Sequence, residues 1–550
     1  MAGVSSARGK VGHGAVTVCT SGHLLPGQPA PCELWPDIEV TLDELRYPAR
    51  LNCASALLDE QVAVLGADRP CLISGTQRWS YGELQRRANQ VAQVLTEDYG
   101  LLPGHRVLLR GPNNPWLVAC WFGVVKAGGV VITTMPLLRS HELGKLVDLT
   151  KTMLALCDHR FGEELTGVSD GLTTVLYGGT GSADLTAQCE TKSGAFINVD
   201  TAADDVMMLA PTSGTTGVPK ATMHFHRDVL AITDTFSRHV LRPRADDVFT
   251  GTPPLAFTFG LGGLVIFPLR AGASTVLLEK ATPAELAAAV NEHKVTVLFT
   301  APTAYRAILR EGKAEQLGAL RRCVSAGEHL PAAVWREFRD ATGVGIIDGI
   351  GATEMLHVFI GAADEQIRPG STGQAVPGYR AAILDDDGQP VPDGTPGRLA
   401  VIGPTGCRYL ADDRQRNYVD RGWNITGDTY IRDAEGYFWY QARSDDMIIS
   451  SGYNIAGPEV EEVLGGHPDV AECAVVGRSD PERGMIVHAA VVLAPGVIGD
   501  EVKAHELQNY VKQTAAPYKY PRSVEFLDAL PRTESGKLQR YKLRTSRVLQ

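Results

Sequence analysis

The stretch PTSGTTGVPK, residues 211–220, joins two short apolar runs at 205–210 and 221–226. Its glycines let backbone N–H groups point into one concavity, and its hydroxyls and lysine add donors, which together suit a polyphosphate. The P-loop spacing GxxxxGK[ST] is absent, and the loop connects two predicted strands instead of opening a helix. A Gly/Thr hairpin turn without a ligand is the alternative interpretation. The residues predicted to hold the phosphates are Thr212, Ser213, Gly214, Thr215, Thr216, Gly217 and Lys220.

Helical and strand patterns alternate on both sides of this loop. Helical apolar spacing is found at 81–95, 116–126, 286–293 and 303–311. Short buried strands are predicted at 106–109, 130–133, 295–300 and 322–325. Such alternation predicts mostly parallel sheets that helices cover on both faces. The expected fold class is therefore α/β, with stacked sheets in a large N-terminal domain.

The sequence pattern changes towards both ends of the chain. Short strands separated by Asp-Gly and Pro-Gly turns predict a small antiparallel, barrel-like part at about 380–444. Residues 445–550 are predicted to form a small, mobile α+β domain. Residues 1–40 have the Gly, Ser and Pro content of a loose lead-in, so the large domain is expected to cover 41–444.

Charge and composition exclude several classes of protein. The 550 residues hold 52 Lys plus Arg against 63 Asp plus Glu, and this net charge of -11 argues against nucleic acid as a partner. Ten cysteines without a CxxC pair indicate a reduced compartment. The apolar run at 116–125 ends at Lys126, about half a membrane span. A cytoplasmic protein without a membrane partner is expected.

Five further motifs follow the phosphate loop in order. They are SAGEHLP (325–331), DGIGATE (348–354), TGD (426–428), RSDDMIISSG (443–452) and PRTESGK (531–537). Together with the loop they resemble the adenylate-forming superfamily, which includes acyl-CoA and aryl-CoA synthetases, adenylation domains of peptide synthetases and luciferases. The resemblance covers 211–537 and extends weakly to about residue 40. It implies that ATP activates a carboxylic acid as an acyl-adenylate, which then passes its acyl group to a thiol.

The resemblance also implies roles in an ATP site. Glu354 beside Thr353 suits Mg²⁺, which prefers hard oxygen ligands. Asp428 is expected to accept hydrogen bonds from the ribose hydroxyls, and Arg443 to reach the same sugar. Asp348 is expected to accept from the adenine amino group, although the family also uses Asn there. The residues expected to flank the base are Gly327, Glu328, Gly349 and Ile350.

Lys537 is the predicted catalytic cation. Attack of a carboxylate on the α-phosphate develops charge on oxygens, and a positioned ammonium stabilises that charge. The alternative is one more lysine in the basic stretch 532–547. Because Lys537 lies more than 300 residues after the phosphate loop, the small domain must close over the large one, and Asp445 resembles the family's hinge residue.

After adenylation, by the same resemblance, the small domain rotates and withdraws Lys537. The segment 450–453 is then presented to the thiol, with Gly452 and Tyr453 in the coenzyme A channel, where a side chain at 452 would obstruct the pantetheine. The sequence departs from the usual pattern at 453–457, where YNIAG replaces a stretch that commonly holds Lys or Arg and Pro.

The acyl pocket of such enzymes is lined by the segments after Pro254 and after Glu354. Phe257 is expected to stack on a planar ring, with an ordinary core phenylalanine as the alternative. The segment 348–359 resembles benzoate-CoA ligases, and the wider pattern resembles ligases for 2-aminobenzoate. The residues expected to border the aromatic ring are Phe257, Gly351, His357 and Val358.

The sequence therefore predicts an aryl-CoA ligase that uses ATP, Mg²⁺ and coenzyme A on a small aromatic carboxylate. Three alternatives stay open: a stand-alone adenylation enzyme that loads a carrier protein, a CoA ligase for a medium-chain aliphatic acid, and a nucleotide-dependent regulatory protein on the same fold. The sequence leaves open whether the protein is a monomer or a homodimer.

Overall fold

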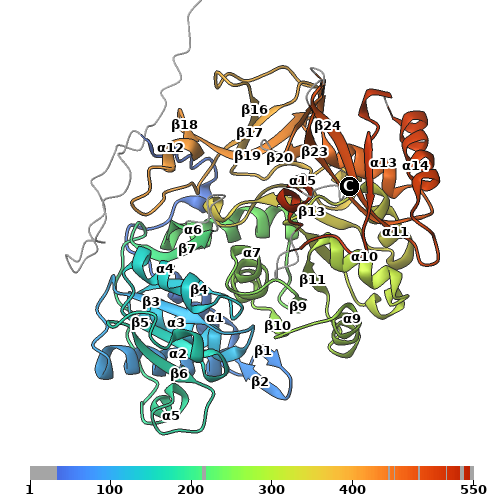
Figure 1. Cartoon of the computed structure of the whole chain (residues 1–550). Coiled ribbons are helices and arrows are strands. Elements are labelled where there is room, and N and C mark those ends of the chain that lie inside the picture. The colour runs from blue at the N-terminus through green and yellow to red at the C-terminus, as the bar shows by residue number, and fades with distance from the viewer. Residues whose placement is uncertain are drawn as a thin grey trace, which may run out of the picture.

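The fold combines parallel sheets, antiparallel sheets and covering helices in a computed structural model (Figure 1). The structure describes residues 34–212, 219–443, 446–450, 453–480, 483–515, 517–532 and 538–545. The described strands form sheets of six, nine, five and five strands. The prediction of an α/β fold with mostly parallel sheets and a separate small C-terminal domain is confirmed.

The phosphate loop belongs to the six-stranded sheet, whose order is β6-β5-β3-β4-β7-β8. Its strands are β3 (Arg106–Arg110), β4 (Val130–Thr134), β5 (Leu154–Asp158), β6 (Thr173–Tyr177), β7 (Val206–Thr212) and β8 (Lys220–Phe225). Neighbouring strands are parallel except β7 and β8, which are antiparallel. This pair aligns Thr212 with Lys220, so the chain enters and leaves the loop at adjacent positions.

The nine-stranded sheet has the order β15-β14-β13-β12-β11-β9-β10-β1-β2. Its strands are β1 (Pro70–Ser74), β2 (Gln77–Ser80), β9 (Val248–Gly251), β10 (Ser274–Val276), β11 (Val297–Thr300), β12 (Arg322–Ser325), β13 (Ile346–Gly351), β14 (Val358–Gly361) and β15 (Gln374–Ala375). The strands from β1 to β13 in this row are parallel, and β2, β14 and β15 add antiparallel ends. At the carboxyl edge of the sheet, Ser325 pairs with Asp348. The α/β sheets bind their ligands at this edge.

Helices cover these two sheets (Figure 1). They are α1 (Glu60–Leu65), α2 (Tyr81–Gln93), α3 (Pro115–Lys126), α4 (Ser140–Thr150), α5 (Leu185–Glu190), α6 (His226–Ile232), α7 (Thr258–Leu261), α8 (Phe267–Ala271), α9 (Pro283–Glu292), α10 (Pro302–Arg310) and α11 (Ala332–Thr342). Asn114 caps α3 by accepting from the Leu117 N–H at 2.9 Å, and Pro115 fits the first helical position. Almost every side chain of α3 is buried, so the apolar run at 116–125 is a core helix, as predicted.

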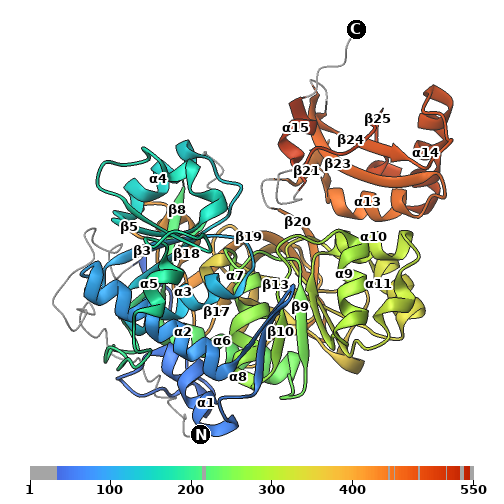
Figure 2. The same cartoon turned by 90° about the horizontal axis from the view of Figure 1, so that it is seen from below.

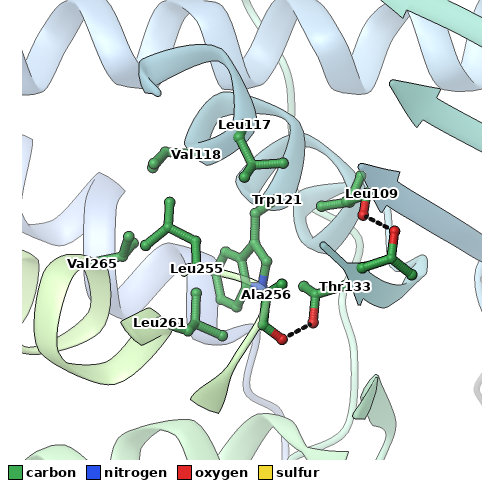
Figure 3. A pocket seen from close by; sticks show the side chains of 10 residues that line it. Leu109, Leu117, Val118, Trp121, Thr133, Leu255, Ala256, Leu261 and Val265 are labelled. Atoms are coloured by element: carbon green, nitrogen blue, oxygen red, sulfur yellow. Dashed lines mark hydrogen bonds between the residues drawn. The ribbon is translucent and has the colours of Figure 1, made fainter. Parts of the chain in front are cut away.

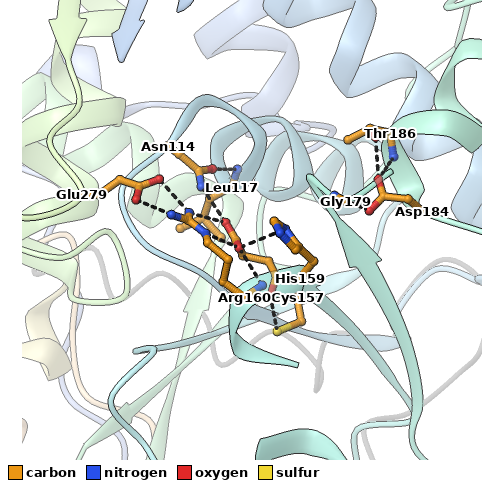
Figure 4. A network of polar contacts seen from close by, with 10 residues as sticks. Asn114, Leu117, Cys157, His159, Arg160, Gly179, Asp184, Thr186 and Glu279 are labelled. Atoms are coloured by element: carbon orange, nitrogen blue, oxygen red, sulfur yellow. Dashed lines mark hydrogen bonds and ion pairs between the residues drawn. The ribbon is translucent and has the colours of Figure 1, made fainter. Parts of the chain in front are cut away.

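A polar network at the end of β5 ties the two large sheets together (Figure 4). Arg160 donates to Asp158 at 2.8 Å and to Glu279, beyond β10, also at 2.8 Å. Asn114 donates to Asp158 at 3.1 Å. Burial acts to raise the pKa of Asp158, but the hydrogen bonds from Arg160 outweigh it and lower that pKa. The network therefore holds β5, α3 and the loop after β10 in fixed positions.

The predicted antiparallel part is a five-stranded sheet in the order β16-β17-β19-β18, with β20 beside β19. Its elements are β16 (Arg380–Leu384), β17 (Gly397–Ile402), α12 (Gln415–Tyr418), β18 (Val419–Asp420), β19 (Trp423–Arg432) and β20 (Phe438–Arg443). The antiparallel prediction is confirmed, but no strand pairing in the described chain closes this sheet into a barrel. Part of the predicted lead-in is bound here, because the Asp37 and Glu39 N–H groups donate to the Gly422 and Gly403 carbonyls.

The small domain has its own antiparallel sheet and core and lies beside α10, next to β20 (Figure 2). The sheet order is β22-β21-β24-β23, and β25 pairs with β24 in parallel. Its elements are β21 (Ile448–Ser450), β22 (Tyr453–Ile455), α13 (Gly457–Gly465), β23 (Val470–Asp480), β24 (Gly484–Leu493), α14 (Glu501–Thr514), β25 (Ser523–Phe526) and α15 (Arg540–Thr545). Arg532 reaches the large domain, where its Nη1 lies 3.6 Å from Glu328 Oε1.

Two composition-based expectations can be compared with the described chain. Its eight cysteines are all free thiols, and seven of them are buried. Among the described residues, none of the helices combines the length and the apolar character that crossing a membrane requires.

Candidate active site

The phosphate end of the site is built where β8 meets the segment 408–410. Backbone hydrogen bonds from Met223 to Arg408 and from Leu410 to Ala221 align the two segments. Lys220 Nζ lies 4.1 Å from the centre of the Tyr409 ring and donates to its hydroxyl. Tyr409 in turn donates to Glu354 Oε1, and Lys220 Nζ lies 3.3 Å from the same oxygen. The structure thus brings the predicted residues Lys220 and Glu354 together.

Thr353 and Glu354 lie in a single short turn of 3₁₀ helix. His224, on the same strand as Lys220, fixes this turn because its Nε2 is 2.8 Å from the Thr353 carbonyl oxygen. A carbonyl oxygen only accepts hydrogen bonds, so the imidazole proton lies on Nε2. Glu354 is buried, with 8% of its surface exposed, and its carboxylate faces Lys220.

The predicted ribose pair is also assembled. Asp428 on β19 aligns with Arg443 on β20, and Arg443 Nη1 lies 3.1 Å from Asp428 Oδ1. Asp428 is buried, whereas half of the Arg443 side chain is exposed. A buried carboxylate beside an accessible guanidinium can accept from a pair of sugar hydroxyls while its own charge stays compensated.

Asp348 lies in the middle of β13, at the proposed adenine pocket. Burial raises the pKa of Asp348 to about 8, against weaker opposing interactions with Ser325 and the Gly349 backbone. Asp348 Oδ1 is buried and has no hydrogen-bond partner in the described chain. Gly349 and Gly351 allow close packing, because a Cβ there would lie 2.8 Å from Val358 Cγ1 and 2.7 Å from the His357 carbonyl oxygen. The neutral carboxyl is therefore held ready for a hydrogen-bonding ligand.

Replacing Asp348 by Asn is expected to change the KM for ATP by less than about threefold, because both neutral groups offer a carbonyl oxygen. Asp348→Ala removes the acceptor and should raise that KM roughly tenfold.

Folded Asp348 keeps its proton up to pH about 8, whereas the unfolded chain releases it near pH ~4. The unfolding free energy of the wild type relative to Asp348→Asn should therefore fall between these two pH values. Parallel pH profiles in urea denaturation would contradict the raised pKa.

His357 is at the centre of an aromatic cluster. The nearest ring is Phe267, with ring centres 4.5 Å apart, and the other rings are Phe236, Phe259 and Phe299. Burial lowers the pKa of His357 to about 3, while a weak interaction with the Phe259 backbone acts in the opposite direction. Neither ring nitrogen makes a hydrogen bond within the described residues. His357 is therefore a neutral imidazole in an apolar, aromatic setting.

The first acyl segment is arranged differently from the sequence interpretation. Phe257 is 37% exposed and precedes α7, whereas Phe259, two residues later, packs 5.7 Å from the His357 ring. Gly262 lies against His357, because a Cβ at Gly262 would approach its Cδ2 to 2.4 Å. Val358 is buried on β14 and pairs with Gly351. Three of the four predicted pocket residues thus lie together, and Phe259 joins them.

A separate apolar cavity lies between α3 and the segment 255–265 (Figure 3). It is lined by Leu109, Leu117, Val118, Trp121, Thr133, Thr134, Leu255, Ala256, Leu261 and Val265. Leu261 faces this cavity, while the next residue, Gly262, faces His357. The helical segment that begins with α7 therefore separates the cavity from the aromatic cluster.

Several predicted residues lie outside the described residues: Ser213, Gly214, Thr215, Thr216, Gly217, Asp445, Gly452 and Lys537. The backbone of Tyr453 begins β22, and Ser450 at the end of β21 pairs with it. The turn at Gly327 has a positive φ of 89°, and the next residue, Glu328, contacts Arg532 of the small domain. The segment that leads to Lys537 therefore starts, at Arg532, beside the predicted adenine site.

Comparison with known proteins agrees with this geometry. Residues 58–409 match the AMP-binding enzyme family, and residues 459–537 match the AMP-binding enzyme C-terminal domain. A benzoate–CoA ligase of Thauera aromatica is 34% identical over 512 residues, which cover 91% of this chain and 97% of the relative.

Two solved structures are similar over almost their whole length. An anthranilate CoA ligase in complex with anthranoyl-AMP superposes with a TM-score of 0.87 at 33% identity, covering 92% of this chain and 98% of that chain. A benzoate CoA ligase from Burkholderia xenovorans LB400 gives a TM-score of 0.83 at 31% identity, covering 90% and 100%.

The chain therefore belongs to the AMP-binding enzyme family. It is an AMP-forming acid–thiol ligase that works through an acyl-adenylate, and within this class it is similar to benzoate–CoA and anthranilate–CoA ligases. The class predicted from the six sequence motifs is confirmed.

Sequence reasoning missed three contributions to the site. Tyr409 lies outside the motifs singled out, and only its pairing with β8 brings it to Glu354. His224 lies four residues after Lys220 on β8, so both side chains lie on one face of the strand. This spacing could have predicted His224 as a site residue. Of the four phenylalanines around His357, Phe259 lies in the predicted segment after Pro254, whereas no local pattern marks the other three.

Proposed function

We propose that this enzyme activates a single-ring aromatic acid, with 2-aminobenzoate as the preferred substrate, and transfers the acyl group to coenzyme A. The observation that carries the proposal is His357, a buried neutral imidazole among four phenylalanine rings. Flat aromatic walls favour a planar ring over a flexible chain. A neutral imidazole also has one acceptor nitrogen, which suits an amino substituent beside the carboxylate.

In the first step, a substrate carboxylate oxygen attacks the α-phosphorus of ATP, the bond to the β-phosphate oxygen breaks, and pyrophosphate leaves. Asp428 and Arg443 would hold the ribose, and Asp348 the adenine amino group. Lys220 would bind phosphate oxygens, and Lys537 would stabilise charge that develops during the attack. The family resemblance implies these roles, and the charges and hydrogen-bonding capacities of the side chains suit them.

Glu354 fits a Mg²⁺ ligand, because a buried carboxylate at the phosphate end of the site offers the hard oxygen that this ion prefers. When bound there, Mg²⁺ would neutralise phosphate charge.

In the second step, the coenzyme A sulfur attacks the acyl carbon and loses its proton, and AMP leaves. Gly452 and Tyr453 would line the thiol path, and Asp445 would be the hinge. A cytoplasmic location also stays a prediction.

The test of this function is pyrophosphate release and thioester formation with benzoate, 2-aminobenzoate, 3-hydroxybenzoate and octanoate, with coenzyme A present or absent. We expect kcat/KM to be highest for 2-aminobenzoate and at least ~100-fold lower for octanoate. Higher kcat/KM with octanoate would contradict the aromatic substrate. Adenylate formation without a thioester would point instead to a carrier protein as acceptor.

His357→Phe is expected to reduce the preference for 2-aminobenzoate over benzoate about tenfold, because it keeps an aromatic ring but removes the acceptor nitrogen. The measurement is the ratio of kcat/KM for the two acids, with the KM for ATP as a control that should not move. An unchanged ratio would remove His357 from recognition of the amino group.

A further inference from the structure

Three polar groups at the phosphate end of the site form a chain with a fixed direction. Lys220 donates to the Tyr409 hydroxyl, and Tyr409 donates to Glu354 Oε1. The direction is fixed because an ammonium only donates and a carboxylate only accepts. Tyr409 therefore bridges the lysine and the glutamate, which also lie 3.3 Å apart directly.

The backbone around Tyr409 is also held in place. The Tyr409 N–H donates to Gln415 Oε1 at 2.8 Å. Gln415 is completely buried and donates to the Cys407 carbonyl at 2.8 Å and to the Leu34 carbonyl at 3.0 Å. Since Leu410 also pairs with β8, the position of the Tyr409 hydroxyl is determined from several sides.

Both contacts of Glu354 described above are made to one oxygen, Oε1. Neither of these two contacts uses Oε2, and the hydrogen bond from the tyrosine holds the carboxylate in place. Lys220 is held beside the carboxylate at 3.3 Å, where its charge compensates the glutamate before a nucleotide arrives.

We propose that Tyr409 is a positioning residue that keeps Lys220 and Glu354 as a preassembled pair for the polyphosphate of a metal–nucleotide complex. It would hold the Glu354 carboxylate in place for the metal ion and keep the Lys220 ammonium beside it. This inference rests on the proposed function, because it needs Glu354 as the metal ligand. Preorganised groups cost no rearrangement when charge must be bound, so loss of the bridge should weaken binding of the metal complex most.

Tyr418 provides a matched control. Its ring meets the Tyr409 ring edge to face at 6.0 Å, and Lys220 Nζ lies 5.7 Å from its centre. The Tyr418 hydroxyl is buried but makes no hydrogen bond with any described residue. Tyr409→Phe thus removes a bridging oxygen, whereas Tyr418→Phe removes a neighbouring oxygen without a partner. Both variants keep the rings that surround Lys220.

The experiment compares the full-length wild type, Tyr409→Phe and Tyr418→Phe. Calorimetry measures the Kd for ATP with and without Mg²⁺, in the absence of any acid, and pyrophosphate exchange with 2-aminobenzoate measures the Mg²⁺ concentration for half-maximal rate. For Tyr409→Phe we expect both the Kd for Mg·ATP and the half-maximal Mg²⁺ concentration to rise roughly tenfold. The Kd for metal-free ATP should change less than about threefold, which corresponds to the loss of one weak contact.

Tyr418→Phe should match the wild type in every measurement, and thermal unfolding should confirm that both variants are folded. Equal effects of the two variants, or an unchanged Mg²⁺ dependence in Tyr409→Phe, would overturn the proposal. Glu354→Gln gives a second route, because Tyr409→Phe should add little to its defect if the tyrosine acts through Glu354. Since binding is measured without an acid, failure of the aromatic-acid function would be seen separately, as absent pyrophosphate exchange.

Discussion

The Lys537→Ala variant is expected to form the acyl-adenylate at least ~100-fold more slowly than the wild type, the scale for losing one preorganised charge stabiliser. Arg532, five residues before Lys537, lies 3.6 Å from Glu328, which follows the Gly327 turn at the predicted adenine site. The second half-reaction should largely survive, because the rotation that we expect of the small domain would withdraw Lys537 for that step. The measurement is thioester formation from ATP and acid, compared with thioester formation from synthetic aroyl-AMP.

Lys542→Ala is the control for the alternative that Lys537 is merely part of a basic stretch. Lys542 lies on α15, five positions further along the same segment, and its loss should leave both half-reactions near the wild-type rate. If Lys537→Ala were equally slow from aroyl-AMP and from ATP, the separation of roles between the two half-reactions would be wrong. Equal losses in both variants would support a general effect of basic charge.

Local patterns predicted the large domain well because its strands and helices are buried elements with strong periodicity. The strand at 322–325 has the predicted bounds, and the strands predicted at 106–109 and 130–133 are each one residue longer. The pairing of elements was less accessible, because the short strands predicted at about 380–444 left open that β19, Trp423–Arg432, pairs with β17, β18 and β20. Its register with β20 aligns Asp428 with Arg443, a relation that the two motifs could suggest but not fix.

The site was predictable where a single motif carries the chemistry and less so where packing decides. Glu354 and Lys220 were found from their motifs, but the tyrosine between them is 189 residues from the lysine. In the acyl segment, Phe257 and Phe259 are equally aromatic in the sequence, and the start of α7 decides which of them reaches His357. The neutral state of Asp348 follows from burial, which no spacing reveals.

The Gly452→Leu variant is expected to retain pyrophosphate exchange near the wild-type rate and to lose thioester formation by ~100-fold or more. The argument is steric: β21 ends at Ser450 and β22 begins at Tyr453, and this segment is the proposed wall of the thiol path. A leucine side chain there would occupy the space that the pantetheine needs, whereas the ATP residues lie on other elements. The size of the effect corresponds to at least ~2.7 kcal/mol in the second transition state.

Gly465→Leu is the matched control in the same domain, because a Cβ at Gly465 meets no atom within 4 Å. It should leave both half-reactions unchanged, so a loss confined to Gly452→Leu cannot be a general effect of adding a leucine to the small domain. Saturation with coenzyme A separates two causes: a blocked path lowers the maximal rate, while a weakened contact raises only the KM for coenzyme A. Normal thioester formation by a folded Gly452→Leu variant would place the thiol path away from Gly452.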